Sequence, residues 1–286
     1  MLGLQLDEMP IFDVLMNTLS NFSDTREHKG LKPLLKWAGG KRWLVPYLGR
    51  IYASHRHRRL VEPFCGGMAI TLGLLPEKAL LNDINPHLIN FYQWVKKGLS
   101  IEIAVANDAS VYYRHRDRFN ELIRKGLADT SEAAQLFYYL NRTGYNGLCR
   151  FNRKGQFNVP FGRYSQINYQ KDFLHYVSVF EKWNFMCTDF ENLILDPEDF
   201  VYADPPYDVP FRQYSDQDFS WQDQVRLAKW LIKHPGPVVL SNQATKRIVE
   251  FYSDLGYKIH FLEGPRTISC KTDRRPAKEV LAVRNL

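Results

Sequence analysis

Short apolar runs of strand length alternate with stretches of helical periodicity in two parts of this 286-residue chain. In the first part, the pattern predicts a helix through Leu44, Leu48 and Ile51, strands at 59–64 and 79–81, and helices at 68–75 and from Pro86 onward. In the second part, it predicts strands at 200–203, 237–241, 258–262 and 279–283 and helices at 221–232 and 246–255. This alternation favours a single parallel-rich α/β sheet.

The segment between these two parts has a different composition and pattern. Residues 112–118 mix aromatic and basic side chains, 133–140 have helical periodicity, and 141–155 are dense in glycine, asparagine and basic residues. We therefore expect a mostly helical module, residues 91–175, inserted into an α/β domain formed by 31–90 and 176–286. Residues 1–30 precede that domain as an N-terminal extension.

The composition is that of a folded protein with an excess of positive charge. Hydrophobic residues make up 45% of the chain, and no apolar run approaches the roughly 20 residues that cross a bilayer. The net charge of +7 favours a polyanionic partner. The four cysteines lack the close spacing of a structural zinc site, so we expect reduced thiols and no metal. The first residues have no basic leader, which makes a cytoplasmic location the expectation.

The most distinctive chemistry directly follows the predicted strand at 200–203, where the chain reads Asp204-Pro205-Pro206-Tyr207. The prolines hold the chain extended, and the carbonyl of Pro205 cannot enter a helical hydrogen bond because a proline follows it. A carboxylate, a carbonyl and an aromatic face suit a planar group with an exocyclic amine, such as a nucleobase. The alternative interpretation is a plain loop start.

Two earlier strand ends have the features of a nucleotide-binding unit. Cys65-Gly66-Gly67 follows the strand at 59–64, and Asp83 ends the next strand, 21 positions after Glu62. Glycines let the backbone approach a ligand, and an acid at the second strand end can accept hydrogen bonds from ribose hydroxyls. A tight turn is the alternative for the glycine pair alone.

A second glycine pair precedes the first helix, in Ala38-Gly39-Gly40-Lys41-Arg42. It is not a P-loop, because Lys36 stands where the earlier glycine belongs and Arg42 where Ser or Thr is required. Either the segment simply starts a helix, or the glycines hold Lys41 and Trp37 against a small molecule.

Residues 141–155 are expected to form loops or a hairpin that presents arginine, asparagine and aromatic side chains outward. These residue types contact phosphates, base edges and base faces. Pro160, Arg163 and Tyr164 extend the same surface. A solvated hairpin without a ligand is the alternative.

The chain resembles the Dam family of DNA adenine N6-methyltransferases from Leu34 to Leu286. Five motifs occur in the family's order, from cofactor motif through target recognition to catalytic motif: 36–41, 62–67, 82–85, 139–164 and 204–207. The resemblance implies a Rossmann-like methyltransferase sheet and S-adenosylmethionine as the methyl donor. It also implies that Asp204 and the Pro205 carbonyl accept hydrogen bonds from N6 of a flipped adenine, with Pro206 in the same motif and Tyr207 stacked on the base. The cofactor residues that it implies are Trp37, Ala38, Gly39, Gly40, Lys41, Glu62, Pro63, Phe64, Gly66, Gly67, Asp83, Ile84 and Asp204.

Members of that family that modify adenine in GATC have a segment similar to 141–164. By position, the DNA-binding residues are expected to be Lys36, Arg142, Tyr145, Asn146, Leu148, Arg150, Asn152, Pro160, Arg163 and Tyr164. The expected partner is double-stranded DNA, bound by a monomer or a dimer. Two departures stand out: Met68 replaces a small residue, and the stretch after Tyr207 is short, with Phe211 and Tyr214 as candidates to close over the adenine.

The same pair of acceptors suits other planar amines. Cytosine N4, an adenine in RNA and a protein amide are alternative targets, and a DNA-binding module without catalysis is a further alternative. The arginine-rich insertion favours duplex nucleic acid, and the retention of Asp83, Asp204 and Tyr207 favours an enzyme.

Overall fold

The computed structural model describes residues 30–208, 219–264 and 277–286. The first half of the chain forms, in order, η1 (Arg42–Leu44), α2 (Val45–Ala53), β1 (Leu60–Glu62), α3 (Ala69–Leu74), β2 (Ala79–Asn82), α4 (Pro86–Lys96), α5 (Ala109–Arg124), α6 (Ser131–Thr143) and η2 (Tyr145–Gly147). The second half forms α7 (Leu174–Phe180), β3 (Trp183–Met186), η3 (Phe190–Asn192), β4 (Phe200–Ala203), α8 (Trp221–Leu231), β5 (Val238–Gln243), α9 (Lys246–Asp254), β6 (Lys258–Gly264) and β7 (Ala277–Arg284).

The strands of the described residues form one sheet of seven strands in the order β3-β2-β1-β4-β5-β7-β6. The strands from β3 to β5 run parallel, whereas β7 pairs antiparallel with both β5 and β6. The predicted parallel-rich α/β sheet is therefore confirmed. The direction of winding reverses between β1 and β4, and α/β sheets bind ligands at the carboxyl ends of strands beside such a reversal.

Alternation along the strands divides the core between the two faces of the sheet. Phe200 and Tyr202 of β4 pack in the cluster that contains Leu48 of α2. Val201, between them, packs in the cluster that contains Leu227 of α8. Burial on both faces explains why these strands read as continuous apolar runs in the sequence.

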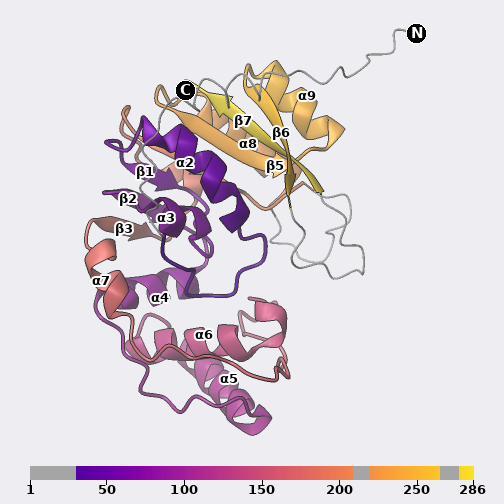
Figure 1. Ribbon diagram of the computed structural model, residues 1–286. Coiled ribbons are helices and arrows are strands. Elements are labelled where there is room, and N and C mark those ends of the chain that lie inside the picture. The colour runs from indigo at the N-terminus through magenta and orange to yellow at the C-terminus, as the bar shows by residue number, and fades with distance from the viewer. Residues whose placement is uncertain (1–29, 209–218, 265–276) are drawn as a thin grey trace.

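The inserted helices lie to one side of the sheet. In Figure 1, α5 and α6 are stacked below it, with α4 and α7 between them and the strands. Helix α4 contacts both parts: Tyr92 stacks on Phe185 of β3, and Phe91 stacks on Tyr138 of α6, each with ring centroids 5.7 Å apart. The domain boundary that we expected at residue 91 thus falls inside a helix that packs against both the sheet and the inserted module.

Side-chain caps explain where several helices begin. The Asn85 side chain accepts hydrogen bonds from the backbone of His87 and Leu88, and Pro86 occupies the first turn of α4, as predicted. Thr130 caps α6 in the same way. Ser220 and Asp223 form a capping box at the start of α8.

The structure differs from the sequence expectations at the end of α6, in β3, α7 and α5, and at Met68, which was expected to begin a helix but precedes α3. Residues 141–143 were expected in a loop but complete the last turn of α6. The edge strand β3 and the helix α7 were not predicted, and α5 was noted only for its mixture of aromatic and basic residues. Met68 adopts a left-handed backbone conformation, with φ of 52°, and its side chain is fully buried.

The described residues contain neither a helix that could span a membrane nor a cluster of side chains that could hold a metal. No helix within 30–208, 219–264 and 277–286 is long and apolar enough to span a membrane. The same ranges contain no group of three or more histidine, cysteine or acidic side chains arranged to hold a metal. Cys65, Cys149 and Cys187 are free thiols, and Cys270 lies outside the described residues.

Candidate active site

Three predicted site acids lie at the carboxyl ends of neighbouring parallel strands. Glu62 ends β1, Asp83 directly follows β2, and Asp204 directly follows β4. Because β2, β1 and β4 are adjacent in the sheet, these positions share one edge. Residues far apart in the sequence are therefore brought together by the topology.

Asp204 occupies a largely desolvated position. Its Oδ1 atom accepts a hydrogen bond of 2.7 Å from the hydroxyl of Ser241 on β5. Burial is the main cause that raises the pKa of this carboxyl, to about 6, and the charge of Glu279 adds to it; Lys41 and Ser241 oppose the shift. Asp204 is therefore mostly ionised at neutral pH and becomes protonated in mildly acidic solution.

Lys41, Tyr207 and Glu279 surround this carboxylate. The Lys41 ammonium lies 3.9 Å from Asp204 Oδ1 and 3.2 Å from Glu279 Oε2. The Tyr207 hydroxyl donates a hydrogen bond of 2.9 Å to Glu279 Oε2, and the Lys41 ammonium lies 4.3 Å from the centroid of the Tyr207 ring. We call Asp204, Tyr207, Lys41, Ser241 and Glu279 the β4 corner.

A buried amide network holds the backbone of the tetrapeptide from behind. The Gln224 amide of α8 donates to the carbonyl of Pro206 at 2.7 Å. The Asn242 amide donates in turn to Gln224 Oε1 at 3.0 Å and to the hydroxyl of Tyr252 at 3.1 Å. Within the described residues, by contrast, no group donates to the carbonyl of Pro205. Among the residues that the structure describes, this acceptor therefore has no partner.

Glu62 is buried and stabilises the start of α3. Its Oε1 atom accepts hydrogen bonds from the backbone amide of Thr71, at 2.8 Å, and from the Thr71 hydroxyl. Burial raises the pKa of this carboxyl to about 8, so it is largely protonated at neutral pH. The structure thus gives Glu62 a local structural role.

Asp83 connects the two strand ends that were predicted to hold a nucleotide. One carboxylate oxygen accepts from the backbone amide of Gly66 at 3.1 Å, and the other accepts from Asn85 at 2.9 Å. Burial raises the pKa of Asp83. Ile84, the next residue, is 71% exposed, which places an apolar surface beside the carboxylate.

The glycine pair at 66–67 makes room for Trp37. A Cβ atom at Gly66 would lie 2.6 Å from Trp37 Nε1, and one at Gly67 would lie 2.8 Å from Trp37 Cβ. Gly66 also has a positive φ of 44°. The motif around Trp37 and the glycine turn after β1 are therefore packed together.

The remaining predicted cofactor residues lie around this turn. Phe64 packs edge-on against Phe219, with ring centroids 5.5 Å apart. The Pro63 carbonyl accepts a hydrogen bond of 2.9 Å from Asn82. Ala38, Gly39 and Gly40 form an exposed loop before η1.

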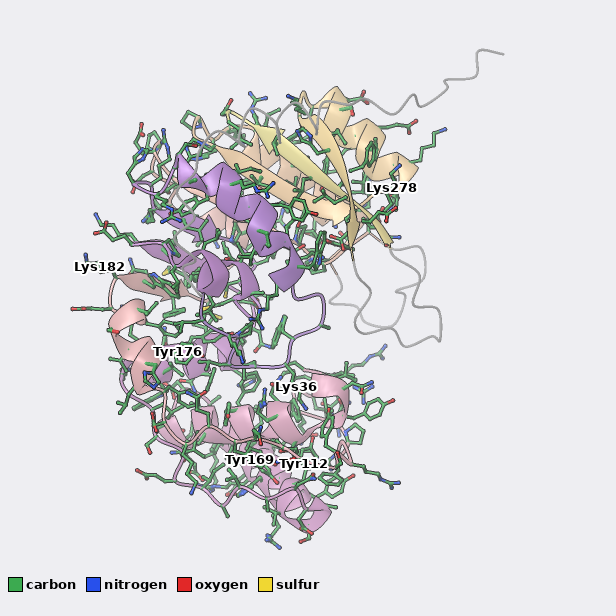
Figure 2. All side chains as sticks on the ribbon, viewed as in Figure 1. Lys36, Tyr112, Tyr169, Tyr176, Lys182 and Lys278 are labelled. Atoms are coloured by element: carbon green, nitrogen blue, oxygen red, sulfur yellow. The ribbon has the colours of Figure 1, made fainter. Side chains whose placement is uncertain are left out.

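Lys36 connects the Trp37 loop to the inserted module. Its backbone amide donates to Asn141 Oδ1, and the Asn141 amide donates back to the carbonyl of Lys36, both at 2.8 Å. The Lys36 ammonium donates to the carbonyl of Arg142 at 2.9 Å and lies 3.5 Å from the centroid of the Tyr164 ring. Burial, aided by Arg142, lowers the pKa of Lys36 to about 8. Figure 2 shows Lys36 at the junction between the sheet and the inserted helices.

The predicted DNA-binding residues at 141–164, here called the recognition segment, begin in the last turn of α6 and continue beyond it. Tyr145, Asn146, Arg150, Pro160 and Arg163 are exposed. Two isolated bridges, Phe151 with Phe157 and Gly144 with Phe161, fold the segment back on itself. The outward presentation that we expected is thus present for these five side chains.

Other members of the recognition segment have contacts within the protein. Asn152 accepts hydrogen bonds from the backbone of Lys154 and Gln156, so its side chain closes a turn. Arg142 is half-buried and donates to the carbonyl of Asn168 at 3.3 Å. Leu148 packs at the edge of the module's core.

Sequence reasoning missed Glu279 and Ser241. Glu279 directly precedes the apolar run from Val280 to Val283 in β7, and a buried charge at the end of such a run is the signal that could have found it. Ser241 has no such signal, because a serine at the end of an apolar strand is common. Phe211 and Tyr214, the proposed covers of the adenine, lie outside the described residues.

Comparison with known proteins identifies the family. The model of the D12 class of N6 adenine-specific DNA methyltransferases matches residues 37–268. The type II methyltransferase M1.LlaDCHI of Lactococcus lactis subsp. cremoris is 35% identical over 86% of this chain and 92% of its own. The DNA adenine methylase of Haemophilus influenzae is 35% identical over 88% and 93%, and that of Escherichia coli K12 is 33% identical over 88% and 95%.

The matches extend over nearly all of each relative, and the range that matches the family model contains Glu62, Asp83 and Asp204. The seven-stranded mixed α/β sheet is the fold expected for such an enzyme. The chain belongs to the D12 class of N6 adenine-specific DNA methyltransferases.

Proposed function

We propose that the protein transfers a methyl group from S-adenosylmethionine to N6 of adenine in duplex DNA, within the sequence GATC, by base flipping and direct transfer. The observation that carries the proposal is the position of two acceptors directly after β4: the Asp204 carboxylate and the Pro205 carbonyl, to which no group within 30–208, 219–264 and 277–286 donates. Two acceptors beside an aromatic ring match an exocyclic amine. Family membership supplies the choice of adenine and DNA.

The residues at the strand ends fit S-adenosylmethionine. Asp83 offers a carboxylate to ribose hydroxyls, and the exposed Ile84 offers an apolar surface to a base. Asp83 and Asp204 are both acidic, which suits a ligand that carries a sulfonium and an ammonium. Trp37, Lys41, Phe64 and the glycine turn at 66–67 complete the proposed site. When bound, the group supplies an electrophilic methyl on sulfur.

Asp204 is proposed to orient the amine and increase its reactivity. The lone pair of an aromatic amine is conjugated with the ring, so catalysis must come from orientation and local electrostatics. Hydrogen bonds from N6 to the Asp204 carboxylate and the Pro205 carbonyl would direct that lone pair toward the donor. The ionised form of Asp204 is required, and its pKa of about 6 leaves the group charged at neutral pH.

The inserted module, residues 91–175, is proposed to bind the duplex. The proposed base readers, or the wedge, are Lys36, Leu148, Arg150 and Pro160. Tyr145 and Asn146 would fill or brace the gap left by the flipped base, and Arg163 and Tyr164 would lie near phosphates. Extruding the base costs a few kcal/mol, which stacking on Tyr207 and contacts in the grooves would offset.

Mapping of modified bases tests the proposal. The chain is expressed in cells without adenine methylation, and its products on plasmid DNA are read by single-molecule sequencing. We expect N6-methyladenine in GATC, and none when Asp204→Ala replaces the wild type. Methylated adenine in another sequence would refute only the assignment of GATC, whereas N4-methylcytosine in place of N6-methyladenine, or no modified base in the plasmid, would refute the proposed target.

A further inference from the structure

Glu279 is a buried carboxylate that the proposed mechanism does not use. Glu279 is 9% exposed and lies on β7, just before Val280 and Leu281. Both of its oxygens have partners: Oε1 accepts from the Lys41 ammonium at 3.2 Å, and Oε2 accepts from the Tyr207 hydroxyl at 2.9 Å. A buried carboxylate is unfavourable unless it is paired, so these two partners account for its position.

The neighbouring strand leaves space for this side chain. Gly264, at the end of β6, lies beside Glu279, and a Cβ atom at that glycine would be 2.6 Å from Glu279 Oε1. The exposed face of the same two strands carries Glu263 and Lys278, which are opposite each other in the register. Of the two glutamates on these strands, Glu263 and Glu279, only Glu279 points toward the β4 corner.

The distances around Lys41 show what Glu279 does to its neighbours. The ammonium is 3.2 Å from Glu279 Oε2 but 3.9 Å from Asp204 Oδ1, so its closer carboxylate is Glu279. Without that partner, the ammonium could approach Asp204 and occupy the acceptor that a target amine needs. Tyr207 would also lose the hydrogen bond that fixes the orientation of its ring.

We propose that Glu279 is a positioning residue for methyl transfer: it fixes the Tyr207 ring and holds the Lys41 ammonium away from Asp204. The proposal rests on the roles proposed above for Asp204 and Tyr207. It adds a contribution from β7, which lies apart from the motifs in the sequence.

The arrangement has an electrostatic consequence that a structural role alone would not produce. Among the described residues, the charged or titratable groups that face Asp204 are Lys41, Glu62, Tyr202, Tyr207 and Glu279. Among them, the charge of Glu279 raises the pKa of Asp204 and that of Lys41 lowers it. Removing the Glu279 charge while Lys41 remains should therefore lower the pKa of Asp204.

The test is single-turnover methyl transfer by the full chain, measured against pH with tritiated S-adenosylmethionine and adenine-unmethylated plasmid DNA. For Glu279→Gln, we expect the plateau rate to fall about 10- to 100-fold. The acid limb of the profile should move to lower pH by up to about one unit. Glu263→Gln makes the same change of charge on the exposed face of β6 and β7. The rate and pH profile of this variant should match those of the wild type.

A second variant probes the hydrogen bond from its other end. Tyr207→Phe removes the hydroxyl and therefore the same hydrogen bond. The fold-loss of rate in the double variant should be smaller than the product of the fold-losses in the two single variants. A Glu279→Gln profile that overlies those of the wild type and Glu263→Gln would overturn the proposal, as would losses that multiply.

If Glu279→Gln does not fold, as judged by thermal unfolding, Glu279→Asp takes its place. Its shorter side chain keeps the charge but cannot reach both partners, and a wild-type rate would overturn the proposal. If the wild type methylates adenine outside GATC, only the sequence assignment is refuted. The test of Glu279 still applies, because plasmid DNA contains those other sites and methyl transfer to them can be measured in the same way.

Discussion

The β4 corner and the recognition segment both depend on polar side chains, but in opposite environments. In the corner, Lys41 and Glu279 are buried and the Asp204 carboxyl is desolvated, with each group held by another. In the recognition segment, Tyr145 and Arg150 are exposed before any DNA is present. The corner is organised in advance for one reaction, whereas the segment gains its main contacts only when a partner arrives.

This difference predicts where single substitutions act. Removing one member of a buried, paired group leaves the others without partners, so the effect should be on turnover. Removing an exposed side chain costs the free protein little, so the effect should be on the choice of DNA. Lys36 and Asn141 connect the two regions through their reciprocal 2.8 Å hydrogen bonds.

The largest effect is expected for Asp204→Ala. Loss of the carboxylate removes a proposed acceptor for the target amine, and we expect the single-turnover rate to fall by at least about 1,000-fold. DNA affinity, measured by fluorescence anisotropy, should stay close to that of the wild type because the recognition segment is unchanged. A rate near the wild-type value would remove Asp204 from the mechanism.

An intermediate effect is expected for Asp83→Ala. The carboxylate holds the Gly66 turn and is proposed to accept from the ribose, so calorimetry should show S-adenosylmethionine affinity reduced by about 10- to 100-fold. Asp254→Ala, an exposed acid at the end of α9, is the matched control. Equal affinity in both variants would mean that Asp83 lies outside the cofactor site.

The smallest effect on overall turnover is expected for Arg150→Ala. Its guanidinium is exposed and is oriented by hydrogen bonds to Asn158, at 2.8 Å for Nε. Discrimination between GATC and singly altered sites should fall by about 1–3 kcal/mol, measured as the ratio of kcat/KM values. Lys154→Ala, in the same exposed turn, should instead weaken all sequences alike. A uniform loss for Arg150→Ala would make it a phosphate contact.

Much of the fold was predictable because burial on both faces leaves a simple pattern. The runs at 200–203 and 79–81 are apolar throughout, and β4 and β2 begin where those runs do. The edge strand β3 escaped prediction because it has only four residues and Asn184, which is exposed, interrupts its apolar pattern. Helix α5 escaped because three of its buried residues, Tyr112, Phe119 and Leu122, are separated by charged ones.

The candidate site was predictable only where chemistry and local sequence coincide. Asp204 and Asp83 follow strands and could be found from the order of elements. Glu279 and Ser241 reach the same corner from β7 and β5, and only the pairing of those strands with the rest of the sheet brings them there. Asn152 shows the converse, since a residue type suited to base recognition is used to close a turn.

The most direct test of the central claim is a crystal structure with a GATC duplex and a non-reactive analogue of S-adenosylmethionine. The account predicts a flipped adenine whose N6 lies within about 3.2 Å of both a carboxylate oxygen of Asp204 and the carbonyl oxygen of Pro205. It would be contradicted by an extruded base bound elsewhere, with Asp204 facing solvent and remote from the analogue.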